Sequence, residues 1–185
     1  MSIICQIEPV GGRRVIHAAL AKRRKHANLI PSLRGAPQTM GPIATYRVRP
    51  RKGEAVADIL SRSRRTGWLY PLIGGSCPGI AHLSRKAGSL RYSGITEGAF
   101  AQRLLDAALF AERHLPASNR EFEARLLEIP TLQVNLLWLR ELRGRNYFVS
   151  LSEGRAAPAF RLTQALKTLI GRAQRPPRKM RRTRA

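Results

Sequence analysis

The sequence predicts an α+β protein: a small antiparallel sheet of about five strands covered by one main helix, with flexible basic N- and C-terminal segments. Short apolar runs separated by Gly, Pro and Asn turns are typical of antiparallel strands. One longer stretch, residues 97–114, has apolar residues at helical spacing. Sixteen Lys or Arg and ten Asp or Glu occupy residues 53–171, a net charge of only +6, so the excess charge lies at the two ends.

The charge and turn residues divide the chain into three parts. Residues 1–52 form a basic, Pro/Gly-rich arm that we expect to be partly disordered; it has eleven Lys or Arg and a single acid. Residues 15–28 of this arm predict a short, Ala-rich helix. Residues 53–170 are expected to form a single α+β domain, and residues 171–185 a disordered Arg-rich tail.

The predicted domain begins with a short helix and three strands. Val56, Ile59 and Leu60 share one face of a helix. The runs GWLYPLIGG (67–75), GIAHLSR (79–85) and SLRYSGI (89–95) then predict an antiparallel meander.

Residues 97–114 predict the helix that covers this sheet. Thr96 is a candidate N-cap, and Pro116 ends the helix. Phe100, Leu104 and Ala108 fall on one stripe, which we expect to face the sheet.

Two patterns compete in the segment that follows. Ser118 and Glu121 have the spacing of a capping box, which favours a helix. The alternation of Phe122, Ala124 and Leu126 with charged residues favours a strand, and Pro130 excludes one long helix.

The apolar run after Pro130 supports the interpretation as strands. It predicts a buried strand over 132–140, and NYFVSL (146–151) is expected to return as its hairpin partner. Residues 156–169 predict a last helix, capped by Gly171.

Two of these stretches also resemble a known family. GITEGAFAQRLLDAALFAE (94–112) and RLLEIPTLQVNLLWLRE (125–141) are similar to a family of small uncharacterised bacterial hypothetical proteins. The resemblance covers about residues 54–151 and implies that they form one domain. It implies no activity, because none is assigned to the family.

Few residues suggest catalysis, and none suggests a cofactor or metal site. Cys5 and Cys77 are far apart and belong to no Cys/His cluster, which argues against a disulfide framework and a structural zinc site. Cys77 lies in the turn IGGSCPG with His82 five residues on, so a thiol enzyme is one alternative. The simpler explanation, which we prefer, is an incidental thiol in a hairpin loop. The turn is not a phosphate loop, since no Gly-Lys-Ser/Thr follows.

Carboxylates and aromatic residues have ordinary structural explanations. Glu121 and Glu123 share one face of the predicted strand with Arg125, as on an exposed salt-bridged face. The aromatic side chains stand beside long apolar runs, and we expect most of them in the core: Trp68, Tyr70, Tyr92, Trp138, Tyr147 and Phe148.

The net charge of +23 favours acidic partners such as DNA, RNA or an acidic protein. The last fourteen residues hold seven Lys or Arg. A GC-rich genome is an alternative source of this charge, because the chain has 28 Arg and 6 Lys. The candidate nucleic-acid-binding residues are Arg175, Arg178, Lys179, Arg181, Arg182 and Arg184, followed by Lys22, Arg23, Arg24 and Lys25.

The sequence therefore predicts a non-enzymatic binding module that contacts nucleic acid or another acidic partner through basic termini. The alternative is a protein–protein interaction or adaptor domain whose basic tails are incidental, with a thiol-dependent enzyme using Cys77 as a third hypothesis. No signal peptide or transmembrane segment is apparent, so a cytoplasmic location is expected.

Overall fold

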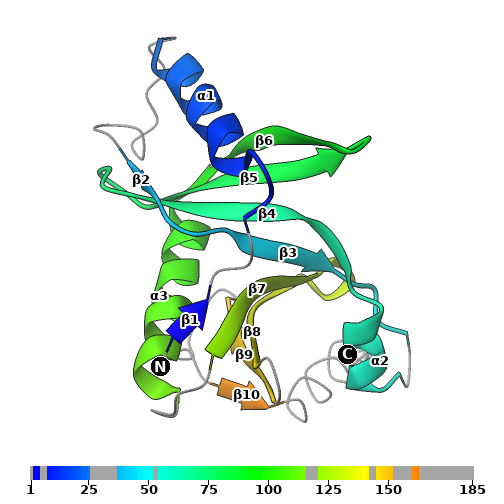
Figure 1. Cartoon of the computed structure of the whole chain (residues 1–185). Coiled ribbons are helices and arrows are strands. Elements are labelled where there is room, and N and C mark those ends of the chain that lie inside the picture. Colours follow the sequence, from blue (N-terminus) through cyan, green and yellow to red (C-terminus); the bar gives the residue numbers. More distant parts are fainter. Residues whose placement is uncertain are drawn as a thin grey trace, which may run out of the picture.

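The structure is a computed structural model of the whole chain, and it describes residues 2–4, 8–25, 37–51, 54–115, 121–141, 145–151 and 160–162. It is a mixed α+β fold built on one large, mainly antiparallel sheet, as the sequence predicts (Figure 1). The strands are β1 (Ser2–Ile4), β2 (Gln38–Thr39), β3 (Ile43–Arg47), β4 (Arg64–Ile73), β5 (Gly79–Lys86), β6 (Ser89–Glu97), β7 (Glu121–Ile129), β8 (Val134–Glu141), β9 (Asn146–Ser150) and β10 (Phe160–Leu162).

The sheet is larger than expected. Among the described residues, eight strands lie side by side in the order β10-β9-β8-β7-β3-β4-β5-β6, and the short strands β1 and β2 pair with β7 and β4. The prediction of about five strands is therefore wrong. Residues 1–52, which were expected to form an arm, supply three of the strands.

The central strand, β3, comes from that arm. It pairs antiparallel with β4 and parallel with β7, with Ala44 opposite both Trp68 and Arg125. Its five residues lie between Pro42 and Pro50, a turn-rich setting that indicates a linker when only local sequence is considered. The meander β4–β6 therefore lies on one side of β3, and the β7–β10 group lies on the other.

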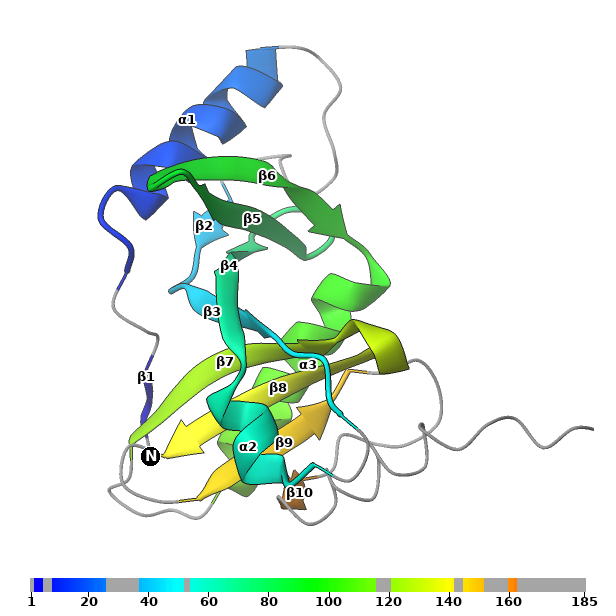
Figure 2. The ribbon, with the colours of Figure 1, turned by 90° about the vertical axis from the view of Figure 1, so that its right-hand side faces the viewer.

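Three helices cover the two faces of the sheet (Figure 2). Helix α3 (Ala99–His114) buries Ala101, Leu104, Ala107 and Ala111 against one face. Helix α1 (Gly12–Lys25) packs Ile16 and Leu20 on the opposite face over β4, β5 and β6. Helix α2 (Val56–Ser61) packs Ile59 on that face over β8 and β9. The main covering helix is thus confirmed, and the second face has helices of its own.

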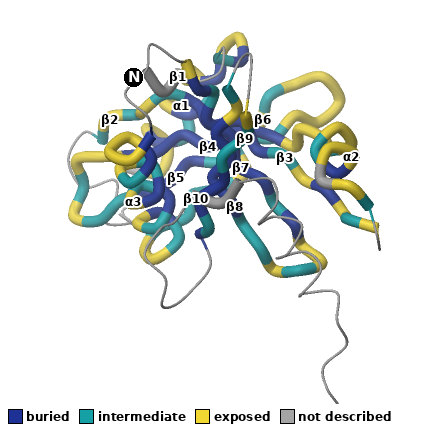
Figure 3. Tube along the Cα trace, turned by 90° about the horizontal axis from the view of Figure 1, so that it is seen from below, coloured by how far each residue is buried: buried dark blue, intermediate teal, exposed yellow. Residues whose placement is uncertain are grey.

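Side-chain alternation along the strands assigns these faces. Leu126 of β7 and Leu137 of β8 belong to the hydrophobic cluster beneath α3. Their neighbours in the chain, Leu127 of β7 and Leu136 of β8, belong to the cluster beneath α2. This is the two-residue period of a strand buried on both faces. Figure 3 shows the buried residues gathered where the strands cross the centre of the molecule.

Several local predictions are confirmed and two are corrected. Residues 121–129 form a strand, and β8 and β9 form the expected hairpin. Helix α3 begins after Gly98, whose φ of 77° suits glycine, and not after Thr96, because the side chain of Thr96 is in β6 and bonds His82. Residues 156–169 were expected to form a helix, but Phe160–Leu162 form strand β10. This run pairs with β9 at the free edge of the β8–β9 hairpin. The rest of 156–169 lies outside the described residues.

Candidate functional site

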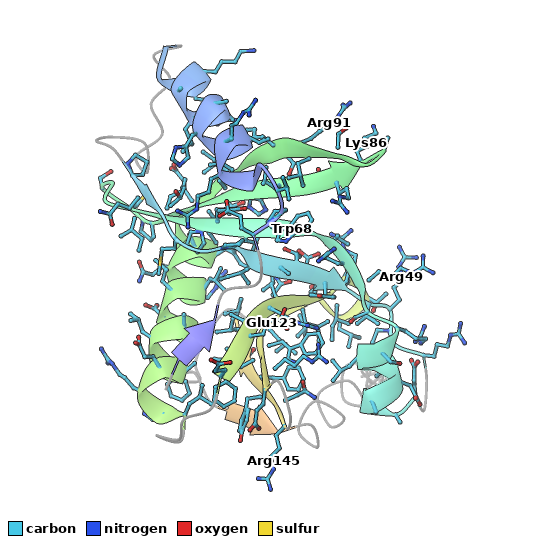
Figure 4. All side chains as sticks on the ribbon, viewed as in Figure 1. Arg49, Trp68, Lys86, Arg91, Glu123 and Arg145 are labelled. Atoms are coloured by element: carbon cyan, nitrogen blue, oxygen red, sulfur yellow. The ribbon has the colours of Figure 1, made fainter. Side chains whose placement is uncertain are left out.

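Exposed basic residues gather at one end of the β4–β6 meander. Arg64 and Arg65 open β4, Arg85 and Lys86 close β5, and Arg91 lies near the start of β6; all five are exposed. Antiparallel pairing of the three strands brings these ends together. Figure 4 shows Lys86 and Arg91 projecting outward from the end of the β5–β6 hairpin.

The basic end of α1 adjoins this group. The Cζ atom of Arg23 lies 5.5 Å from the ring centroid of Tyr92, the residue after Arg91 in β6. Burial raises the pKa of Tyr92, and the charge of Arg23 opposes that rise. Lys22 and Arg23 are exposed. We call the combined group the basic surface: Lys22, Arg23, Arg64, Arg65, Arg85, Lys86 and Arg91.

Trp68 holds two members of the basic surface in place. The Cζ atoms of Arg65 and Arg85 lie 4.9 and 5.9 Å from its ring centroid. Such cation–π contacts are worth about 0.5–2 kcal/mol. The indole itself is 3% exposed, so it orients the guanidinium groups and presents no free face for a base.

The other aromatic residues agree with this assignment. Tyr70, Trp138 and Phe148 are buried, as the sequence predicts, whereas Tyr92 and Tyr147 are half-buried. Among the described residues, the basic surface therefore offers positive charge without exposed aromatic rings on which bases could stack.

The predicted site residues are only partly placed by the structure. Lys22 and Arg23 lie on the basic surface, and Arg24 and Lys25 complete α1. The tail residues lie outside the described residues: Arg175, Arg178, Lys179, Arg181, Arg182 and Arg184. The five sheet residues of the basic surface were not predicted, because the charge was averaged over residues 53–171, whose net charge is only +6, and the acid-free stretch 64–96 was not considered separately. Their signal was the RR pair before one strand of the meander and the RK pair after the next.

The structure gives Cys77 and His82 different partners. The Sγ atom of Cys77 lies 3.9 Å from Oε2 of Glu97, while Nε2 of His82 lies 2.8 Å from Oγ1 of Thr96. Burial lowers the pKa of His82, and the charge of Glu128 opposes that effect. A thiol paired with an imidazole base, which a Cys77 nucleophile requires, is not formed by these contacts.

The Glu123–Arg125 pair is real, but it does not lie on an exposed face. Nη2 of Arg125 donates to Oε2 of Glu123 at 2.5 Å, and the two side chains are 10% and 12% exposed. The expectation of a solvated salt-bridged face is wrong for this pair, because β7 is central in the sheet and α2 lies over the same face. Glu121, at the start of β7, is exposed as expected.

The Cζ atom of Arg125 also lies 4.7 and 4.8 Å from the ring centroids of Tyr46 and Trp138. Its Nε atom is buried and has no hydrogen-bond partner among the residues that the structure describes. An arginine held between two rings and bonded to one carboxylate is fixed in position, with part of its donor capacity unused.

Searches for metal sites and for relatives add no further assignment. Within the described ranges, no three His, Cys, Asp or Glu side chains gather closely enough to hold a metal ion. No helix in the described part of the chain is long and apolar enough to cross a membrane.

Comparison of the chain with family models, curated proteins and solved structures finds no match.

Proposed function

We propose that the protein is a non-enzymatic binding module for nucleic acid, and that the basic surface acts together with the basic termini. The observation that carries the proposal is the contact of Arg23 with Tyr92. It joins the basic run at the end of α1 to the basic end of the β4–β6 meander. Charges from two separate parts of the sequence thereby meet at one end of the folded domain: strand alternation places Arg65 and Arg85 on the α1 side of the meander with Arg23, and Lys86 and Arg91 on the other side.

The charge balance of this surface supports the proposal. Residues 64–96 contain five Lys or Arg and no Asp or Glu. All five are exposed, so they can reach phosphates without first breaking a buried ion pair. Lys and Arg side chains that neutralise phosphates release condensed counterions, which gives affinity without sequence preference.

The tail extends the same chemistry. Its seven Lys or Arg in fourteen residues form a polycation that favours phosphate backbones. In this proposal the folded surface fixes an orientation on the polymer, and the tail adds affinity.

The first experiment compares two double variants of the full chain that remove equal charge. Arg85→Gln/Arg91→Gln acts on the basic surface. Arg113→Gln/Arg145→Gln removes two exposed arginines elsewhere, one at the end of α3 and one that projects from the opposite end of the molecule in Figure 4. Binding to labelled duplex DNA and single-stranded RNA is measured over a series of salt concentrations.

The surface variant is expected to weaken binding and to reduce the log–log salt slope on duplex DNA by about 2, since each phosphate contact contributes about 0.9. The control variant should change both quantities much less. Equal losses in the two variants would mean that only total charge matters, and unchanged binding in both would exclude the basic surface. In that case an acidic protein partner, as the adaptor hypothesis requires, becomes the next candidate.

A further inference from the structure

A pocket of about 360 Å³ opens between α2 and the strands β3, β7, β8 and β9. Arg125, Arg140, Trp138 and Asn146 line its sheet side. Ser61 and Ser63, from the end of α2 and just after it, line the other. The volume lies in the range of small-molecule sites. The pocket shares no lining residue with the basic surface, although Ser63 directly precedes Arg64.

The buried arginine at this pocket lacks a full set of acceptors. Arg125 is 8% exposed as a whole residue, and its Nε–H has no hydrogen-bond partner within the described part of the chain. Burying a donor without an acceptor is unfavourable, so a ligand that supplies a strong acceptor beside this guanidinium recovers that free energy.

The charges at the pocket point to an anion. A single carboxylate, Glu123, serves both arginines: its Oε2 atom lies 2.5 Å from Nη2 of Arg125 and 4.0 Å from Nη1 of Arg140. Among the ion pairs of the described residues, two guanidinium groups share this one carboxylate, which leaves an excess of one positive charge at the pocket. None of the described residues that line the pocket is Asp or Glu.

The neutral polar groups define the rest of the ligand. Oδ1 of Asn146 accepts a bond from Nε1 of Trp138 at 2.7 Å, which leaves the amide NH₂ as a donor. The hydroxyls of Ser61 and Ser63 donate to the backbone oxygens of Asp58 and Leu60, so their oxygens remain as acceptors. Donors therefore face a ligand on the sheet side, and acceptors face it on the α2 side.

We propose that this pocket binds a small organic oxyanion, a phosphate ester or a carboxylate that also carries a hydroxyl group. The oxyanion lies against Arg125, Arg140 and Asn146, and the hydroxyl donates to Ser61 or Ser63. Stacking of a base or aromatic ligand is not part of the proposal, because the guanidinium of Arg125 already lies over the rings of Tyr46 and Trp138.

The test uses three probes that share one carbon skeleton: glycerol 3-phosphate, glycerate and uncharged glycerol. The chain has two tryptophans, so in a Trp68→Phe background the fluorescence comes from Trp138 alone, at the pocket wall. Titration of this full-length variant should give a saturable change with glycerol 3-phosphate or with glycerate, and none with glycerol. Which of the two anions saturates identifies the oxyanion.

Arg140→Gln is the decisive variant. The side chain of Arg140 is 48% exposed, so its replacement should disturb the fold less than replacement of the buried Arg125. It should weaken anion binding about tenfold or more, as expected for loss of a charge-assisted hydrogen bond. Arg125→Lys keeps the charge beside Glu123 but removes the planar fork, and it should weaken binding by a similar factor.

The controls separate this pocket from the basic surface. Arg145→Gln, outside the pocket, and Arg85→Gln/Arg91→Gln, on the basic surface, should leave the affinity within about twofold of the parent. The proposal is overturned if neither anion gives a saturable change, if glycerol gives the same change, or if the basic-surface variant abolishes binding while Arg140→Gln does not. None of these results bears on nucleic-acid binding, which is measured separately.

Discussion

Arg125 and Glu123 lie two positions apart on β7 and point to the same face, where Nη2 of Arg125 lies 2.5 Å from Oε2 of Glu123. Both side chains are nearly enclosed, and the arginine is held over Tyr46 and Trp138. A charge in the middle of a sheet is stable only with a partner, so the local fold depends on this carboxylate.

Glu123→Gln should therefore destabilise the protein by about 3 kcal/mol, because it leaves the buried guanidinium without a counterion. Glu128→Gln is the matched control on the same strand. Glu128 accepts from Arg47 at 2.8 Å, but those side chains are 24% and 55% exposed, and exposed ion pairs are worth about 0–1 kcal/mol. Urea unfolding followed by circular dichroism measures both; equal effects would mean that enclosure of Arg125 has no energetic consequence.

Gly67→Ala should destabilise the contact between β4 and β5. A Cβ atom at this position would lie 2.1 Å from the backbone oxygen of Leu83, which cannot rotate away as a side chain would. The expected loss is about 1–3 kcal/mol, as for other overpacked sites. Ser89→Ala, at an exposed position of β6, serves as the control for thermal unfolding. An unchanged melting temperature for Gly67→Ala would show that the two strands separate easily.

Local pattern predicted much of the fold. The alternation of Phe122 and Ala124 with charged residues outweighed the capping-box spacing and predicted the strand correctly, because these apolar side chains both pack on the α3 side of β7. The same reasoning failed at β3. Its parallel partner begins about 80 residues later, and no local signal reports a pairing at that separation.

The pocket escaped sequence analysis for the same reason. An alternating Glu and Arg usually marks a solvated strand face. Here Tyr46 from β3 and the end of α2 cover that face, and both come from segments far from Arg125 in the sequence. The sheet part of the basic surface could be predicted more easily, since its position follows from the correctly predicted β4–β6 meander and the positions of the basic pairs in the sequence.

His82 should make stability depend on pH below neutrality. Burial lowers its folded pKa from the ordinary value of 6.5, so between these two values the unfolded chain binds more protons than the folded chain. Its contribution to stability is complete above about pH 7 and is lost as the pH falls toward the lowered pKa. Between pH 7.5 and 5.5, urea unfolding should show a larger loss for the wild type than for His82→Gln; parallel curves would contradict the assignment.

Removal of residues 172–185 should weaken nucleic-acid binding and flatten its salt dependence. If five to seven of the seven basic residues contact phosphates, the log–log slope on duplex DNA should fall by about 4 to 6, at about 0.9 each. Residues 172–185 are also removed from the Arg85→Gln/Arg91→Gln variant. If the tail and the basic surface contact different phosphates, the loss of affinity in this combined variant should equal the product of the losses caused by the truncation and by the double substitution. A combined loss no larger than that of the truncation alone would mean that the polymer is held by the tail, and that the positive end of the meander is not part of the interface.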